Sequence, residues 1–180
     1  IRGEGTQCAI VDPGDPAPVM ETLQREGLDL RYILLTHHHP DHIGGMPELK
    51  KYSGAVVFGP RDQRITGVDH ALREGDIARL PELGLEFAVL DVPGHTSSHI
   101  VFWGHGCLFC GDTLCSVGCG RLFEGTAEQM QSSLDKLAAL PPSTRVYCGH
   151  EYTRANCEFA LAVEPGNEAL HRKAQAVGRL

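Results

Sequence analysis

The feature that most constrains this chain is the stretch THHHPDH at residues 36–42, which directly follows the apolar run YILL at residues 32–35. A short apolar run of this kind predicts a buried strand, so the polar stretch is expected where that strand ends. Imidazole and carboxylate groups crowded at such a position are typical of a metal site, and an internal, interrupted tract is not an affinity tag. The sequence therefore predicts metal-dependent chemistry.

The spacing within this stretch predicts two neighbouring sets of ligands. In an extended segment alternate side chains share a face, so His37 and His39 can bind one ion while the residue between them points away. Pro40 fixes φ and suits the first turn of a helix. We therefore expect Asp41 and His42 at a strand-to-helix corner, where they can serve a second ion.

Three further polar pieces follow predicted strands: PGHT at 93–96 after 85–92, GDT at 111–113 after 107–110, and GHE at 149–151 after 145–148. Ligands that arrive at the ends of several strands mark a site along one edge of a sheet. The number of candidate ligands fits a centre with two ions. The first ion would take His37, His39 and His95, the second Asp41, His42 and His150, and Asp112 would bridge them.

Nitrogen and oxygen ligands without a thiolate suit zinc first, with iron or manganese as possible occupants. Two such ions about 3.5 to 4 Å apart would lower the pKa of a water held between them and so provide a hydroxide nucleophile. Taken singly, His95 or His150 would be an ordinary hydrogen-bonded histidine and Asp112 a turn-former. His99 is expected to be structural, although it could support a ligand.

The motifs THHHPDH, GHT, GDTL, GCGRLFEGT and CGHEYT together resemble the metallo-β-lactamase superfamily, and within it the glyoxalase II (hydroxyacylglutathione hydrolase) branch. The resemblance implies an α/β fold, an αββα sandwich of two mixed β-sheets flanked by helices. It implies the same seven ligands as the spacing does, with Asp112 and Asp41 as candidate catalytic residues.

The resemblance also implies a substrate, a glutathione thioester such as S-D-lactoylglutathione, hydrolysed to a 2-hydroxy acid and glutathione. Arg121 and Tyr152 match positions that contact the glutathione part. Phe123 matches a position that is often tyrosine, so an apolar ring surface remains there without the hydroxyl. A thiol with a pKa of about 8.5 is a good leaving group, so no separate general acid is required.

Several alternatives remain open. The same scaffold supports a persulfide dioxygenase with a single iron, a lactonase and a nuclease. A metal-stabilised module that binds a thiol compound without turnover is the non-enzymatic alternative. A structural zinc site could also use the closely spaced thiols of Cys107, Cys110, Cys115 and Cys119, but strand alternation would turn the first two to opposite faces.

Composition sets the remaining limits. At 180 residues, with 42% hydrophobic and 22% charged residues, the chain has the size of one domain, 1–180, in which 151–180 forms a helical tail that begins a substrate-binding region. A net charge of −7 argues against nucleic-acid and membrane partners, and no pattern indicates a protein partner. Seven cysteines, an odd number, favour a reducing cytoplasm over a disulfide scaffold. Parts of the N- and C-terminal regions are expected to be missing.

Strands are expected at residues 7–11, 31–35, 85–92 and 99–103, and helices at 16–25, 127–140, 153–163 and 167–177. Gly27 should end the first helix. The apolar stripes of the later helices are expected to pack in the core.

Overall fold

The computed structural model describes residues 1–178 and contains strands and helices in alternation. The strands are β1 (Gln7–Val11), β2 (Asp29–Leu34), β3 (Val56–Pro60), β4 (His70–Leu72), β5 (Ile77–Leu80), β6 (Leu85–Asp91), β7 (Ile100–Gly104), β8 (Cys107–Gly111), β9 (Leu114–Cys115), β10 (Gly118–Cys119) and β11 (Arg145–Cys148). The helices are α1 (Pro16–Glu26), α2 (Pro40–Ile43), α3 (Met46–Ser53), α4 (Ala127–Ala138), α5 (Thr153–Val163) and α6 (Glu168–Val177), and a short 3-10 helix covers Pro81–Leu83.

The first sheet has the order β1-β2-β3-β4, and each of its neighbouring pairs is parallel. Parallel strands are usually covered on both faces and therefore carry apolar residues at successive positions. The run at 32–35 follows this rule, because Tyr32 and Leu34 face one core cluster while Ile33 and Leu35 face another. This is why the run shows no alternation with polar residues.

The second sheet has the order β11-β8-β7-β6-β5 and mixes antiparallel pairs with one parallel pair, β11 with β8. The short strands β9 and β10 form a separate antiparallel pair. Helix α4 covers the outer face of this sheet, where Leu137 packs in a cluster with Val92, Val101 and Leu108. The expected strands 85–92 and 99–103 are therefore confirmed, with ends shifted by a single residue.

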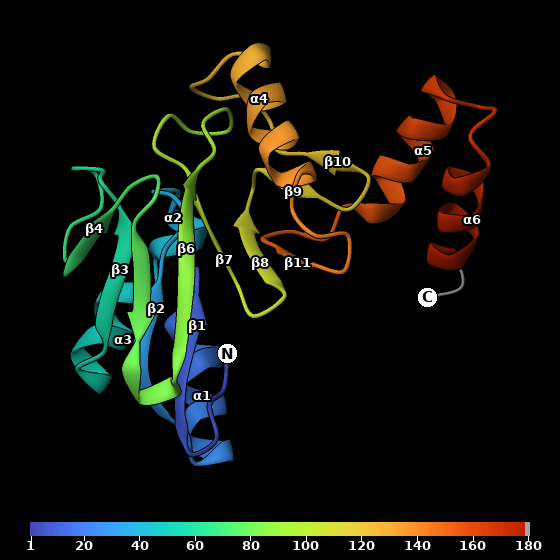
Figure 1. Ribbon diagram of the computed structural model, residues 1–180. Helices are drawn as coiled ribbons and strands as arrows, with labels where there is room; N and C mark the ends of the chain where they lie inside the picture. The colour runs from blue at the N-terminus through green and yellow to red at the C-terminus, as the bar shows by residue number, and fades with distance from the viewer. Residues whose placement is uncertain (179–180) are drawn as a thin grey trace.

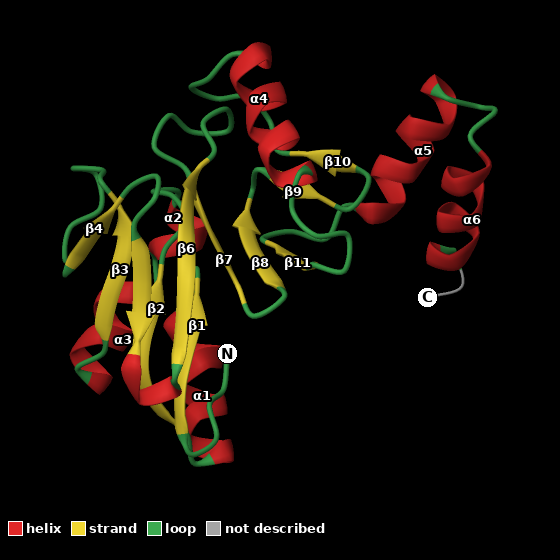
Figure 2. Cartoon of the chain, in the orientation of Figure 1, coloured by secondary structure: helices red, strands yellow, loops and turns green. Residues whose placement is uncertain are grey.

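The two sheets face each other with helices outside, which gives the expected αββα layers (Figure 2). The core between the sheets takes side chains from both, including Leu34 and Phe58 of the first and Phe87 and Phe102 of the second. Helices α1 and α3 cover the other face of the first sheet through Leu23 and Leu49. The layered architecture predicted by the resemblance is confirmed.

Local signals set the ends of the first helix. The side chain of Asp15 accepts a hydrogen bond from the backbone N–H of Ala17, and Gly27 ends the helix in the left-handed conformation with φ of 61°. Glycine is favoured at such a position because it carries no Cβ. The expected end of this helix at Gly27 is confirmed.

Helices α5 and α6 pack on each other at the C-terminal side, to one side of the two sheets (Figure 1). They match the expected helices 153–163 and 167–177, while positions 179 and 180 of the expected tail lie outside the described residues. Within residues 1–178, no helix combines the length and apolar character that crossing a bilayer requires.

Candidate metal centre

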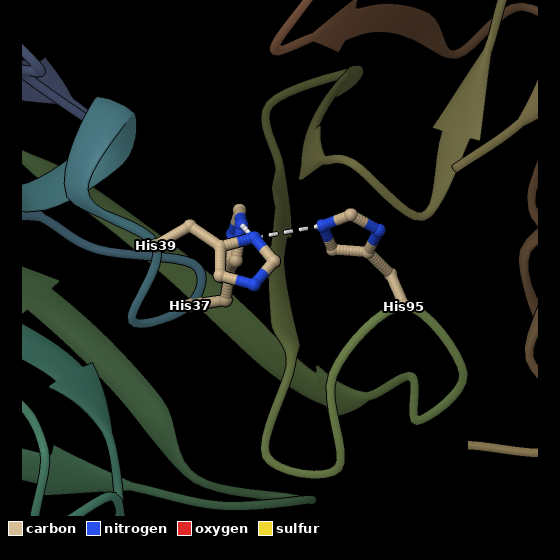
Figure 3. Close-up of side chains that lie close together, drawn as sticks. All are labelled: His37, His39 and His95. Carbon is tan, nitrogen blue, oxygen red and sulfur yellow. Dashed lines mark hydrogen bonds between the residues drawn. The ribbon is translucent and has the colours of Figure 1, made fainter. Parts of the chain in front are cut away.

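The first predicted ligand set comes together at the edge where strands β2 and β6 end. The loop after β2 supplies His37 and His39, and the loop after β6 supplies His95. The Nδ1 atom of His39 lies 3.1 Å from Nε2 of His37 and 3.0 Å from Nε2 of His95 (Figure 3). Three imidazole nitrogens from two distant parts of the chain therefore point at one another.

The second predicted set lies beside the first. Pro40 opens helix α2, as expected, and the next residues supply Asp41 and His42. His150, from the loop after β11, brings its Nε2 within 3.2 Å of Asp41 Oδ2 and 3.4 Å of His42 Nε2. The corner between β2 and α2 thus contributes to both sets.

Asp112 stands between the two sets and contacts both. Its Oδ1 lies 3.2 Å from Nε2 of His42, and its Oδ2 lies 3.4 Å from Nε2 of His95. The same Oδ2 is 3.3 Å from Nε2 of His150. This is the position of a carboxylate that could serve both ion positions with its two oxygens.

The donors fit divalent cations. The ligand atoms of His37, His39 and His95, and those of Asp41, His42 and His150, form groups whose members all lie within 4.8 Å of one another. Oδ1 of Asp112 is buried and lacks a well-aligned hydrogen-bond partner, although Nε2 of His42 lies 3.2 Å away, and this is costly for a carboxylate unless a cation or water satisfies it. Within residues 1–178 no such group contains a cysteine, which leaves the thiol alternative without support.

The electrostatics of the cluster favour cation binding. Burial, followed by repulsion from neighbouring histidines, lowers the pKa of both His37 and His39, so their rings stay neutral and keep a lone pair for a metal. Burial also acts to lower the pKa of His42, but hydrogen bonds with Asp112 and Asp12 raise it to about 10. The two carboxylates thus favour positive charge at this position, which a bound cation could supply.

Asp12, which no sequence motif indicated, holds the loop at residues 36–42 in place. Its Oδ1 accepts the backbone N–H of Thr36 at 2.7 Å, and its Oδ2 accepts the Thr36 hydroxyl at 2.7 Å. The same Oδ2 lies 3.0 Å from Nδ1 of His42, the ring nitrogen opposite the one that faces His150. An acid directly after strand β1 and before Pro13 was the available signal.

His99 supports the centre without joining a ligand set. It is buried, stacks on the ring of His37 at 4.6 Å and 17°, and its Nε2 accepts the backbone N–H of Asp112 at 3.2 Å. Gly111 packs beside it with φ of 48°, and a Cβ there would overlap the Thr36 hydroxyl. The residue before Asp112 therefore has to be glycine.

The predicted substrate residues surround the ligands. The carbonyl oxygen of Arg121 accepts a hydrogen bond from Nδ1 of His95 at 2.7 Å, which leaves Nε2 of His95 free for a cation. The ring of Phe123 meets the rings of His39 and His95 edge-on, with centroids 5.4 Å and 5.3 Å away, and is 60% exposed. Tyr152, also exposed, stacks on His150 with centroids 5.4 Å apart.

Comparison with known proteins identifies the family of this chain. The model of the metallo-beta-lactamase superfamily matches residues 1–150. The hydroxyacylglutathione hydrolase of Pseudomonas fluorescens is 53% identical over 175 residues, which cover 97% of this chain and 68% of that protein. The crystal structure of ETHE1 from Myxococcus xanthus has a TM-score of 0.74 at 36% identity, over 84% of this chain and 69% of that one.

A further solved structure, TTHA1623 in a di-iron-bound form, has a TM-score of 0.67 at 32% identity and covers 79% of this chain and 80% of that one. The folds thus agree over most of both chains. The superfamily model matches most of the chain, and the Pseudomonas fluorescens protein is more than half identical to nearly all of it. Both findings identify the same family. The chain belongs to the metallo-β-lactamase superfamily and, within it, to the hydroxyacylglutathione hydrolase (glyoxalase II) family.

Proposed function

We propose that this protein hydrolyses a glutathione thioester such as S-D-lactoylglutathione, giving a 2-hydroxy acid and glutathione. The observation that carries the proposal is the convergence of both predicted ligand sets on Asp112, beside an exposed rim that presents Phe123 and Tyr152. The family name of the curated relative gives the same activity for that protein.

We propose zinc as the occupant of both sets, since imidazole and carboxylate donors suit it, with iron or manganese as alternatives. The di-iron form of the solved relative supports iron as a possible occupant. Bound divalent ions would supply a water of lowered pKa and polarise the thioester carbonyl. His37, His39 and His95 would hold one ion, Asp41, His42 and His150 the other, and Asp112 both.

The protein's own groups would orient the reactants. Oδ1 of Asp112 can accept a hydrogen bond from the attacking water and aim it at the acyl carbon. Asp41, exposed at the start of α2, faces His42 and His150 and would fix the second ion on the solvent side of the centre. The departing thiolate needs no protonation to leave, because a thiol has a pKa of about 8.5.

The substrate's charge and shape match the rim. Glutathione carries two carboxylates, and the Arg121 guanidinium, 5.8 Å from the centroid of the Phe123 ring, is a charged donor suited to one of them. The Phe123 ring offers an apolar surface beside the reacting bond, and the Tyr152 hydroxyl a polar contact. We propose these three as the substrate-binding residues.

We further propose that residues 1–180 work as a single hydrolase domain, in which the tail 151–180 begins substrate binding through Tyr152. All seven cysteines are free thiols, which suits a reducing compartment, and we propose the cytoplasm. The partner is then a small molecule, the thioester itself. The complete second ligand set favours this hydrolase over a dioxygenase with a single iron.

The experiment is to load purified protein with zinc and follow thiol release from S-D-lactoylglutathione beside an ordinary ester and a β-lactam. We expect turnover of the thioester only. Asp112→Asn should abolish it, while Asp135→Asn on the exposed face of α4 should not. Turnover of the ester or the lactam, with none of the thioester, would overturn the substrate class.

A further inference from the structure

A second polar cluster, which contains none of the predicted metal ligands or substrate residues, lies beside the metal centre and joins three loops. It uses Asp62 and Arg64 from the loop after β3, Ser97 and Ser98 from the loop before β7, and Glu124 from the segment before α4. These residues are far apart in sequence, so their meeting ties distant loops together.

Arg64 lies at the middle of this cluster and is held by two carboxylates. Its Nε donates to Oδ1 of Asp62 at 2.8 Å, and its Nη2 donates to Oδ2 at 2.6 Å. Its Nη1 donates to Oε1 of Glu124, and its Nη2 lies 3.3 Å from Oε2. Such a planar fork fixes the guanidinium more firmly than a single ion pair on the surface would.

The two carboxylates are themselves anchored. Oδ2 of Asp62 accepts the Ser98 hydroxyl at 2.5 Å, and the Asp62 side chain is only 5% exposed. Oε2 of Glu124 accepts both the backbone N–H and the hydroxyl of Ser97, each at 2.8 Å. Asp62 thus connects the β3 loop directly to the loop that carries His95, and Arg64 connects the β3 loop to Glu124.

Glu124 belongs to the segment 120–125, which lies on the metal centre. In this segment the N–H of Phe123 donates to the carbonyl of His95 at 3.2 Å, and the N–H of Gly125 donates to the carbonyl of Gly94 at 3.0 Å. Besides the hydrogen bond between Nδ1 of His95 and the carbonyl of Arg121, the segment is held through the Glu124 side chain. Its position therefore sets where Phe123 and Arg121 stand relative to the reacting bond.

The cluster also contacts the loop at residues 36–42, which carries the candidate metal ligands. The ring of His38 lies between the two carboxylates, with Nδ1 3.6 Å from Oδ2 of Asp62 and Nε2 3.5 Å from Oε1 of Glu124. Because His38 sits between two predicted ligands in the chain, the loop that carries them and the segment 120–125 share one support.

We propose that Arg64 and Glu124 form a clasp that positions the segment 120–125 over the metal centre and thereby sets the affinity for the glutathione part of the substrate. The proposal rests on the proposed function for its substrate. Both are positioning residues, since neither reaches the reacting atoms. A displacement of the Arg121 and Phe123 side chains would cost binding of the glutathione part, while the backbone hydrogen bonds between the segment and His95 remain.

The kinetic test compares Arg64→Ala and Arg64→Lys with Arg61→Ala, an exposed arginine of the same loop, as the control. We expect Arg64→Ala to raise KM for the glutathione thioester about tenfold, with kcat and metal content close to wild type. Arg64→Lys should restore little, because an ammonium cannot bridge two carboxylates as the fork does. KM for a thioester of N-acetylcysteamine, which lacks the γ-glutamyl and glycine parts, should stay unchanged.

A double-mutant cycle with Glu124→Gln identifies the partner. If the clasp acts as a unit, the effects of Arg64→Ala and Glu124→Gln on KM will be less than additive. Unchanged KM in Arg64→Ala, or an equal rise for both thioesters, would overturn the proposal. A lowered urea midpoint with unchanged KM would show support of the fold alone and would overturn it too.

Amide hydrogen exchange tests the clasp without any turnover. Arg64→Ala should speed exchange in the segment 120–125 and leave the strands at their wild-type rate, whereas Arg61→Ala should change neither. Wild-type protein that hydrolyses no glutathione thioester would contradict the proposed function. The exchange measurement would still decide the clasp, and unaltered exchange in the segment would reject it.

Discussion

At the residue scale, the candidate metal centre contains groups that orient the candidate ligands as well as the ligands themselves. Asp12 holds Nδ1 of His42 and the backbone of Thr36, so that Nε2 of His42 points into the centre. Carboxylates that orient a ligating histidine in this way also raise its basicity. Asp12 itself adopts a φ of 48°, a conformation that aspartate tolerates better than most residues.

Changing Asp12→Asn should therefore weaken the centre. An amide cannot match the charge that holds His42 and Thr36, so we expect metal affinity to fall roughly 10- to 100-fold. Competition with a chromophoric chelator measures the affinity. Asp15→Asn, three residues further on at the helix cap, is the control, and an affinity equal to wild type in Asp12→Asn would contradict the assigned role.

Glu124 makes a pH-dependent contribution to stability. Its hydrogen bonds with Arg64 lower its pKa from 4.5 to about 2. Since the folded pKa lies below the unfolded one, this contribution is fully present above pH 4.5 and is lost as the pH falls through about 2.

We expect the difference in urea midpoint between wild type and Glu124→Gln, both in chelator, to be constant near neutral pH and to shrink as the pH drops below 4.5. Glu21→Gln on the exposed part of α1 is the control. A difference that stays the same or grows on acidification would refute the ionised pair.

The candidate ligands could be predicted from the sequence because each one stands in a short motif next to a strand. His37, His95 and Asp112 could be placed in this way without knowledge of the fold. The position of Asp12 after a strand was visible, but its role depends on contacts with Thr36 and His42 that no local pattern shows. For His99 the sequence indicated a structural residue that could support a ligand, and its contact with the N–H of Asp112 agrees with that. The pairing of Arg64 with Glu124, 60 residues apart, likewise has no local signal.

At the element scale, local capping signals predict helix ends well. The side chain of Thr126 accepts the N–H of Gln129 at 3.3 Å, and the side chain of Gln129 accepts the N–H of Thr126 at 2.9 Å. This reciprocal pair is a capping box at the start of α4. The helix was expected to run to Leu140 but ends at Ala138, because its apolar stripe continues into the following turn.

Removal of this cap measures its contribution to the free energy of unfolding. Thr126→Ala should lower the free energy of unfolding by about 1 kcal/mol, because the backbone N–H of Gln129 at the helix start loses its partner. Urea denaturation of the metal-loaded protein measures the loss. Ser132→Ala, in the exposed middle of α4, should change stability by less than about 0.5 kcal/mol, and an equal loss in both variants would argue against the cap.

At the scale of the whole molecule, residue patterns alone could not predict which strands pair with one another. The run 32–35 predicted a buried strand, yet its parallel neighbours β1 and β3 follow from the crossover helices between them. The αββα layers came from the family resemblance. The residue patterns did predict that candidate ligands from four loops meet at one edge of the sandwich.

Two cation positions that share Asp112 are the central feature of the proposed enzyme. The most direct measurement is metal content by mass spectrometry after zinc loading and dialysis, in wild type and in His150→Ala. We expect two zinc ions per chain in wild type and one in His150→Ala, because that change removes a ligand of the second set only. A single ion in wild-type protein, or two retained in His150→Ala, would contradict the paired centre.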